Sequence, residues 1–142
     1  MHKPKHSFKS LRIIRFIAAF GIAVTPFLCK ATANSFPVYF TTNDAVLATE
    51  ATAVLADIYN IYVVRPYSKI TVSGHADTVG PPYHNLRLSK RRAYGVAAEL
   101  INLGVDRSRI TVKWHGETLL PYPTPNNFSE PYNRCVVINI SD

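Results

Sequence analysis

The stretch GHADTVG, residues 74–80, decides how this sequence is read, because a strand pattern ends in it and a carboxylate follows at once. Residues 70–73 alternate apolar and polar side chains, which is typical of a half-buried strand. Gly74 and Gly80 flank Asp77, and we expect both glycines to bend the backbone. Asp77 is then either an ordinary turn residue or a side chain placed to meet a ligand.

The same periodicity predicts the other elements on both sides of this stretch. Strands have apolar residues at every second position, and amphipathic helices have them three or four positions apart. Gly and Pro mark the breaks, with turn and capping residues at 41–44 and a Pro-rich loop at 118–132. The predicted strands cover 36–40, 69–75, 110–114 and 136–140, and the predicted helices run from about 47 to 64 and from 85–89 to 102.

The order of these elements predicts the fold class. Strand, helix, strand, helix, strand, loop and strand follow one another, which is a βαβαβ-β arrangement. Two amphipathic helices and four strands bury their apolar faces most economically in two layers. The expected fold is therefore α+β, with two helices packed on one face of a mixed four-stranded sheet.

The N-terminus has the features of a secretory signal peptide. Residues 1–33 hold six of the sixteen basic residues and none of the nine acidic ones, so the rest of the chain carries a net charge of only +1. A basic stretch precedes the apolar run 16–28, and Ala31-Thr32-Ala33 forms a small-x-small cleavage pattern. The run is shorter than the roughly 20 residues of a membrane span. We therefore predict a signal peptide at 1–33 and a single mature domain at 34–142.

Two alternatives for the N-terminus stay open. If it is not cleaved, the segment would anchor the chain in the inner membrane, and the domain would be a subunit of a larger assembly. Lipidation of Cys29 is the other membrane-bound alternative, although Phe27 and Leu28 are large for a lipoprotein signal. After cleavage Cys135 has no intrachain disulfide partner, and we expect it to be a small buried hydrophobe.

A metal centre or a catalytic site is weakly supported. His75 and Asp77 share one face of an extended strand and could be two ligands, or a base and its orienting partner. Further ligands would have to come from His84, His115 and Glu117, which match no standard ligand spacing. An enzyme would also need a nucleophile or base that this pattern does not supply. We predict no enzymatic activity, no metal and no cofactor.

Nucleic-acid binding is also disfavoured. Arg87 and the run 90–92 form a basic cluster at the start of the second helix. The net charge of +1 for the mature domain gives no extended basic surface, so electrostatic binding to phosphates would be weak. Secretion would also separate the domain from nucleic acid.

Asp77 and Arg92 suggest a binding site for a small zwitterion. In a strand–loop–helix unit, the end of the strand and the start of the helix lie near one rim of the fold. If Asp77 and Arg92 touch, they form a structural salt bridge, which the spacing alone favours. If they are held apart, the carboxylate suits an ammonium group and the guanidinium suits a carboxylate.

Several motifs, in order and at matching spacing, resemble the OmpA-like domains of the OmpA, Pal and MotB type that associate with peptidoglycan. The central motifs are G-x-x-D-x-x-G at 74–80 and N-x-x-L-S-x-x-R-A-x-x-V at 85–96. The supporting segments are 38–43, 104–110, 116–121 and 133–134, and the resemblance covers 36–141.

The resemblance implies a groove that holds the meso-diaminopimelate of the peptidoglycan stem peptide. The family's roles then carry over to Asp77, which would contact the ammonium group, and to Arg92, which would contact the carboxylate. Asn43, Asn85 and Arg134 match other positions of the groove. The implied function is non-covalent peptidoglycan binding that links the wall to envelope components, in the periplasm or at the outer membrane. With an uncleaved N-terminus the domain would instead be the wall-binding subunit of a larger envelope assembly, and a cell-wall enzyme is the less favoured alternative. Cys135 departs from the family pattern by replacing the second Arg of N-R-R-V.

Overall fold

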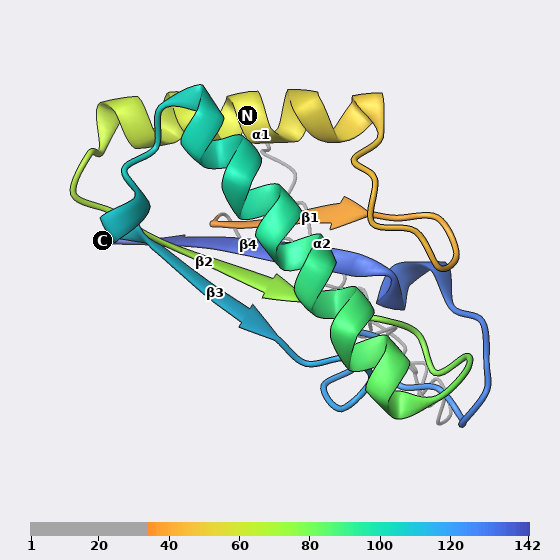
Figure 1. Cartoon of the computed structure of the whole chain (residues 1–142). Helices are drawn as coiled ribbons and strands as arrows, with labels where there is room; N and C mark the ends of the chain where they lie inside the picture. The colour runs from red at the N-terminus through yellow and green to blue at the C-terminus, as the bar shows by residue number, and fades with distance from the viewer. Residues whose placement is uncertain (1–33) are drawn as a thin grey trace, which may run out of the picture.

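A mixed four-stranded sheet forms one layer of the protein and two helices form the other (Figure 1). The computed structural model describes residues 34–142, so the predicted signal peptide and Cys29 lie outside the described residues. The predicted two-layer α+β fold is confirmed. The elements are β1 (Ser35–Tyr39), α1 (Thr49–Val64), β2 (Lys69–Gly74), α2 (Pro82–Leu103), β3 (Ile110–Trp114) and β4 (Cys135–Ser141), with short 3-10 helices at Arg107–Arg109 and Pro131–Asn133.

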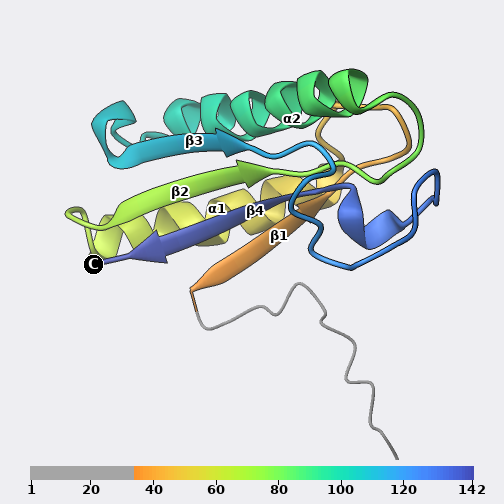
Figure 2. The same cartoon turned by 90° about the horizontal axis from the view of Figure 1, so that it is seen from below.

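The strands lie in the order β1-β4-β2-β3 (Figure 2). β2 and β3 are parallel, so the chain must cross over between them, and α2 is that crossover. β4 runs antiparallel to both β1 and β2 and therefore occupies the interior of the sheet. This topology places the loop after β2 and the start of β4 at the same end of the sheet.

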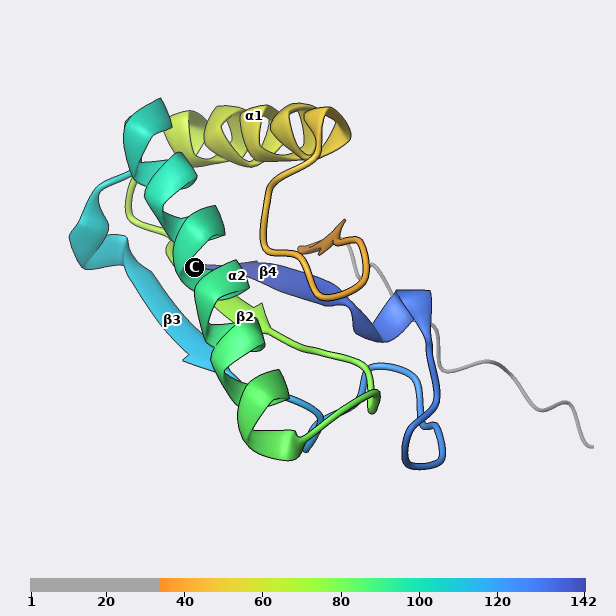
Figure 3. The same cartoon turned by 45° about the vertical axis from the view of Figure 1, so that its right-hand side comes forward.

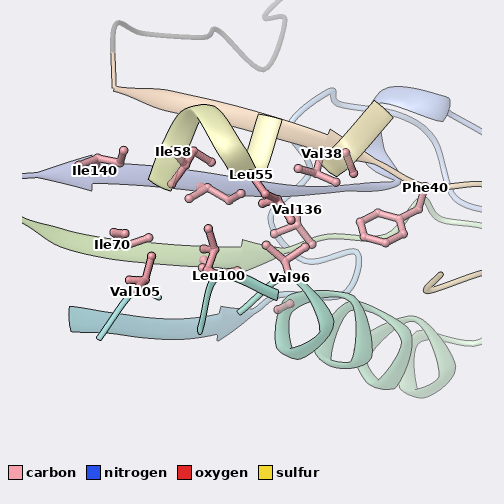
Figure 4. Close-up of a cluster of buried hydrophobic side chains, with 14 residues drawn as sticks. Val38, Phe40, Leu55, Ile58, Ile70, Val96, Leu100, Val105, Val136 and Ile140 are labelled. Atoms are coloured by element: carbon pink, nitrogen blue, oxygen red, sulfur yellow. The ribbon is translucent and has the colours of Figure 1, made fainter. Parts of the chain in front are cut away.

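The core lies between the helices and the two interior strands (Figure 4). Leu55 and Ile58 of α1 and Leu100 of α2 have no exposed surface, and they pack on alternate residues of β2 and β4. Fully burying one such side chain stabilises the fold by about 1.5–3 kcal/mol. Cys135 is also fully buried, as predicted.

The starts of both helices differ from the sequence prediction. α2 begins at Pro82 and not within 85–89, because proline lacks an N–H that a first helical residue does not need. α1 begins only at Thr49, and the Asp44 carboxylate instead accepts the amides of Ala45 and Val46 in a turn. Within residues 34–142, neither helix combines the length and apolarity that crossing a membrane requires.

The two glycines of the GHADTVG stretch have different roles. Gly80 has a φ of +89°, a left-handed conformation that favours glycine, so the predicted bend is confirmed there. The prediction of a bend at Gly74 is wrong. A Cβ atom at Gly74 would lie 2.1 Å from the backbone oxygen of Ser89, so this glycine is needed because α2 crosses β2 closely. Ser89 itself bonds backbone, since it donates to the carbonyl of Leu86 and accepts the amide of Gly116.

Candidate ligand-binding groove

A groove of about 310 Å³ opens where the loop after β2 meets the N-terminal end of α2. Figure 3 shows that loop running from β2 to the start of α2. Three of the five predicted site residues, Asn43, Asp77 and Asn85, line the groove together. The full lining comprises Thr42, Asn43, Asp77, Val79, Gly80, Pro81, His84, Asn85 and Leu88.

Asp77 forms an ion pair with a fourth predicted residue, Arg134. Arg134 Nη1 donates to Asp77 Oδ2 at 3.0 Å, and the two side chains are only 12% and 8% exposed. Arg134 also donates to the Phe40 carbonyl and to the Ser129 hydroxyl, which fixes its position just before β4. The partner of Asp77 is therefore Arg134, and the bond uses only one of the two carboxylate oxygens.

Arg92, the fifth predicted residue, is fully buried beside the groove. Its guanidinium donates to three backbone carbonyls: Nε to Asp44 at 2.7 Å, Nη1 to His75 at 3.1 Å and Nη2 to Thr41 at 3.0 Å. Burial lowers the pKa of Arg92 to about 10, opposed by the negative charge of Asp77. Arg92 therefore stays charged at neutral pH and ties three separate segments together.

Asn85 is oriented by a residue that the sequence pattern did not single out for the groove. Its Nδ2 donates to Glu117 Oε2 at 2.6 Å and to the Val79 carbonyl at 3.1 Å. Both amide hydrogens are thereby used, which leaves Oδ1 as an acceptor. Because α2 begins at Pro82, Asn85 lies inside the helix and does not cap it.

His84 orients Asn43 so that its amide nitrogen, and not its amide oxygen, is left for a ligand. His84 Nε2 lies 2.7 Å from Asn43 Oδ1, so the ring nitrogen donates and the amide oxygen accepts. The amide nitrogen of Asn43 is then the group left to donate to a ligand. The sequence offers one signal for His84 as a groove residue, its position directly before Asn85 in the motif.

The loop 77–80 is held from outside by the Pro-rich loop. Thr78 Oγ1 donates to the Pro125 carbonyl at 2.6 Å and accepts the Phe128 amide at 2.9 Å. The Asn127 amide donates to the Thr78 carbonyl. The Pro-rich loop thus supports the backbone that carries Asp77.

His75 does not point to a metal site. Its Nδ1 bonds the Leu119 carbonyl at 2.7 Å, and its ring stacks on His115 with centroids 5.2 Å apart. Burial lowers the pKa of His75 to about 4, so the ring is neutral near pH 7. Across residues 34–142, no cluster of three His, Cys, Asp or Glu side chains could hold a metal ion.

Known envelope proteins share part of this sequence. The chain is 40% identical over 76 residues to outer membrane porin F of Pseudomonas fluorescens, covering 54% of the chain and 22% of that protein. It is 34% identical over 104 residues to the probable lipoprotein YiaD of Escherichia coli K12, covering 73% and 48%. The chain therefore spans less than half the length of either relative. These relatives confirm the predicted location in the cell envelope.

Solved structures share the fold. The peptidoglycan-associated lipoprotein of Burkholderia pseudomallei superposes with a TM-score of 0.68 at 23% identity, covering 74% of this chain and 89% of that one. The C-terminal domain of Helicobacter pylori MotB superposes with a TM-score of 0.61 at 23% identity, covering 75% and 84%. Residues 39–134 match the model of the OmpA family, which is more than half of the chain. The chain belongs to the OmpA family.

Proposed function

We propose that this protein binds peptidoglycan non-covalently, and that the groove takes the free end of meso-diaminopimelate in the stem peptide. Membership of the OmpA family supports peptidoglycan as the ligand. A structural relative, from Burkholderia pseudomallei, is named as peptidoglycan-associated. The domain would link the wall to other envelope components without cleaving it.

The observation that carries the proposal is the carboxylate of Asp77 in the groove wall. Its side chain is 8% exposed, and its Oδ2 is paired with Arg134. Oδ1 is then the oxygen that meets the ammonium group of the ligand. A charge-assisted hydrogen bond in such a sheltered place is stronger than one between neutral groups.

The two groove amides fit the same ligand. Asn85 Oδ1, left as an acceptor by Glu117, adds a second oxygen for the ammonium group. Asn43 Nδ2, left as a donor by His84, suits the ligand carboxylate, which accepts hydrogen bonds. A zwitterion would therefore be bound in one orientation.

Arg92 supplies positive charge for the ligand carboxylate. Three of its five N–H groups are bonded to backbone, which leaves one hydrogen on each terminal nitrogen. The side chain has no exposed surface, so direct contact requires residues 41–44 to move aside. Without that movement Arg92 acts through its charge, which is weakly screened at a buried position.

A pulldown with purified peptidoglycan tests the proposal. The protein is mixed with diaminopimelate-type sacculi, and Asp77→Asn is compared with Asp57→Asn, a matched change on the exposed side of α1. With circular dichroism showing that both variants are folded, we expect Asp77→Asn to weaken binding by about tenfold or more, as for loss of a charge-assisted bond, and Asp57→Asn to bind as wild type. Equal binding by both variants would remove Asp77 from the site.

Two further measurements test which ligand is bound and whether it is cleaved. Lysine-type peptidoglycan lacks the second carboxylate at the end of the side chain, and we expect it to bind more weakly. Sacculi recovered after incubation should release no soluble fragments. Release of fragments would contradict a binding function without turnover.

A further inference from the structure

A second groove, of about 270 Å³, lies on the other side of α2 along strand β3. The groove exists because α2 covers β3, a strand at the edge of the sheet, only in part. Ile70 and Val72 of β2 are fully buried, whereas their neighbours Ile110 and Val112 of β3 remain half-buried. The groove is lined by Tyr94, Ala97, Ala98, Ile101, Arg107, Ile110 and Val112, and the two alanines leave the space beside β3 open.

The backbone of β3 can accept another strand. In the described sheet β3 is an edge, with β2 on one side only. The His115 amide donates to Gly74, so the alternation of a strand turns the amides of Val112 and Trp114 away from β2. Such outward amides and carbonyls are a template for strand addition.

The opposite edge of the sheet is protected, which makes β3 the accessible one. The Phe40 amide donates to the Arg134 carbonyl, so the even-numbered residues of β1 face β4. Pro37 then takes the outward position in the middle of β1, where it has no N–H to offer. β3 has no proline.

The charges around β3 specify the kind of partner. Lys113 is exposed on the face of β3 that points away from α2, and Arg107 lines the groove. Lys90 lies at the same edge, 4.8 Å from the Trp114 ring centroid. The groove lining contains no acidic residue, and the nearby Asp106 carboxylate is bonded to the Ser108 amide.

We propose that β3 and this groove bind an extended segment of a partner protein in which apolar and acidic residues alternate. The segment adds a fifth strand to the sheet, with backbone bonds to β3. Its apolar side chains fill the groove beside Ala98 and Val112, and its acidic side chains lie next to Lys113.

A second copy of this chain fits the edge less well. Pairing of β3 with β3 would bring basic side chains of both copies, such as Lys113, onto one face of a shared sheet. Like charges on opposed strands are destabilising. An acidic segment from another protein meets the opposite charge and is favoured for that reason.

The probe is a capped peptide in which valine and glutamate alternate. It has about eight residues, which is a typical strand length. Binding to the purified chain is followed by fluorescence anisotropy, and the site is mapped by amide chemical shifts. We expect saturable binding, shifts at 110–114 and not at 35–39, and binding of a valine–lysine peptide at least about tenfold weaker. Absence of saturable binding, or equal binding of the two peptides, would overturn the proposal.

Three variants localise the binding. Lys113→Glu reverses the charge, and Ala98→Phe fills the groove from an exposed position on α2, so both should weaken the valine–glutamate peptide by about tenfold. Arg65→Glu, an exposed change away from β3, should bind as wild type, with circular dichroism checking the fold of all three. Wild-type binding by Lys113→Glu and Ala98→Phe would contradict the site.

Two controls separate binding at β3 from binding in the peptidoglycan groove and from self-association. Asp77→Asn, under conditions where circular dichroism shows it to be folded, should bind the peptide as wild type, so the result is independent of the peptidoglycan groove. Sedimentation should show a monomer at the concentration of the titration. Self-association that blocks the peptide would assign the edge to a second copy and overturn the proposal.

Discussion

Arg134 Nη1 lies 3.0 Å from Asp77 Oδ2, although 57 residues separate the two in sequence. The pair joins the loop after β2 to the start of β4 and so fixes one wall of the groove. Both side chains are nearly buried, and either charge would be poorly solvated without the other. The pair is therefore structural as well as a part of the proposed binding site.

Removal of Arg134 should destabilise the fold far more than removal of an exposed arginine. Arg134→Gln leaves the Asp77 carboxylate without its ionic partner, and breaking such a pair costs about 3–5 kcal/mol. Arg65 pairs with Asp142 at 3.8 Å, with side chains 55% and 80% exposed, so Arg65→Gln should cost no more than about 1 kcal/mol. Urea unfolding measures both, and similar losses in the two variants would contradict the structural role.

Arg92 should be required for the stability of the fold as well as for binding. Arg92→Ala leaves the carbonyls of Thr41, Asp44 and His75 without their donor, and we expect a loss of about 3–5 kcal/mol. The adjacent Arg91 is exposed, and Arg91→Ala should change stability by less than about 0.5 kcal/mol. Thermal unfolding compares them, and a stable, well-folded Arg92→Ala protein would refute this assignment.

Periodicity predicted the fold because each element carries its own apolar face. The alternation of residues 70–73 and the helical spacing in α1 and α2 depend only on near neighbours in sequence. The prediction for Gly74 failed because a distant contact decides there. Gly74 is required by the backbone of Ser89 on another element, and no local pattern reports that crossing.

The candidate site divides in the same way. Asp77 and Asn85 belong to one strand–loop–helix unit, so sequence spacing could place them in one groove. The spacing could not show that Arg134 would pair with Asp77, or that Arg92 would be bonded by backbone carbonyls of two other segments. Those contacts depend on how β1, β2 and β4 are ordered in the sheet.

Gly74 and Gly95 give a matched test of the packing of α2, because an added Cβ atom would clash at Gly74 and not at Gly95. A Cβ at Gly74 would lie 2.1 Å from the Ser89 oxygen, so Gly74→Ala must push α2 from the sheet and should cost about 1–3 kcal/mol. The nearest atom to a Cβ at Gly95 is the Ala45 oxygen at 4.0 Å. Gly95→Ala should stabilise α2 by up to about 1 kcal/mol. Denaturant unfolding that ranked the variants the other way would refute this packing.

The free energy of unfolding should fall as the pH is lowered, because His75 takes up a proton when the chain unfolds. Burial keeps this ring neutral in the folded protein, with a pKa of about 4, and outweighs the hydrogen bond to the Leu119 carbonyl, which favours the protonated ring. An exposed histidine has a pKa near 6.5. The unfolded chain therefore binds a proton first as the pH falls. The stabilisation is complete above about pH 6.5, decreases between pH 6.5 and 4, and is lost below pH 4, a change of about 3 kcal/mol.

Replacement of the ring should remove most of that change. In His75→Gln the side chain cannot take up a proton in either state, so the free energy of unfolding should vary less between pH 7 and 4 than in wild type. Asn126→Gln, an exposed change in the Pro-rich loop, should keep the wild-type slope. Urea unfolding at a series of pH values makes the comparison. An unchanged slope in His75→Gln would show that other groups cause the acid sensitivity, because the proton taken up on unfolding would then not belong to this histidine.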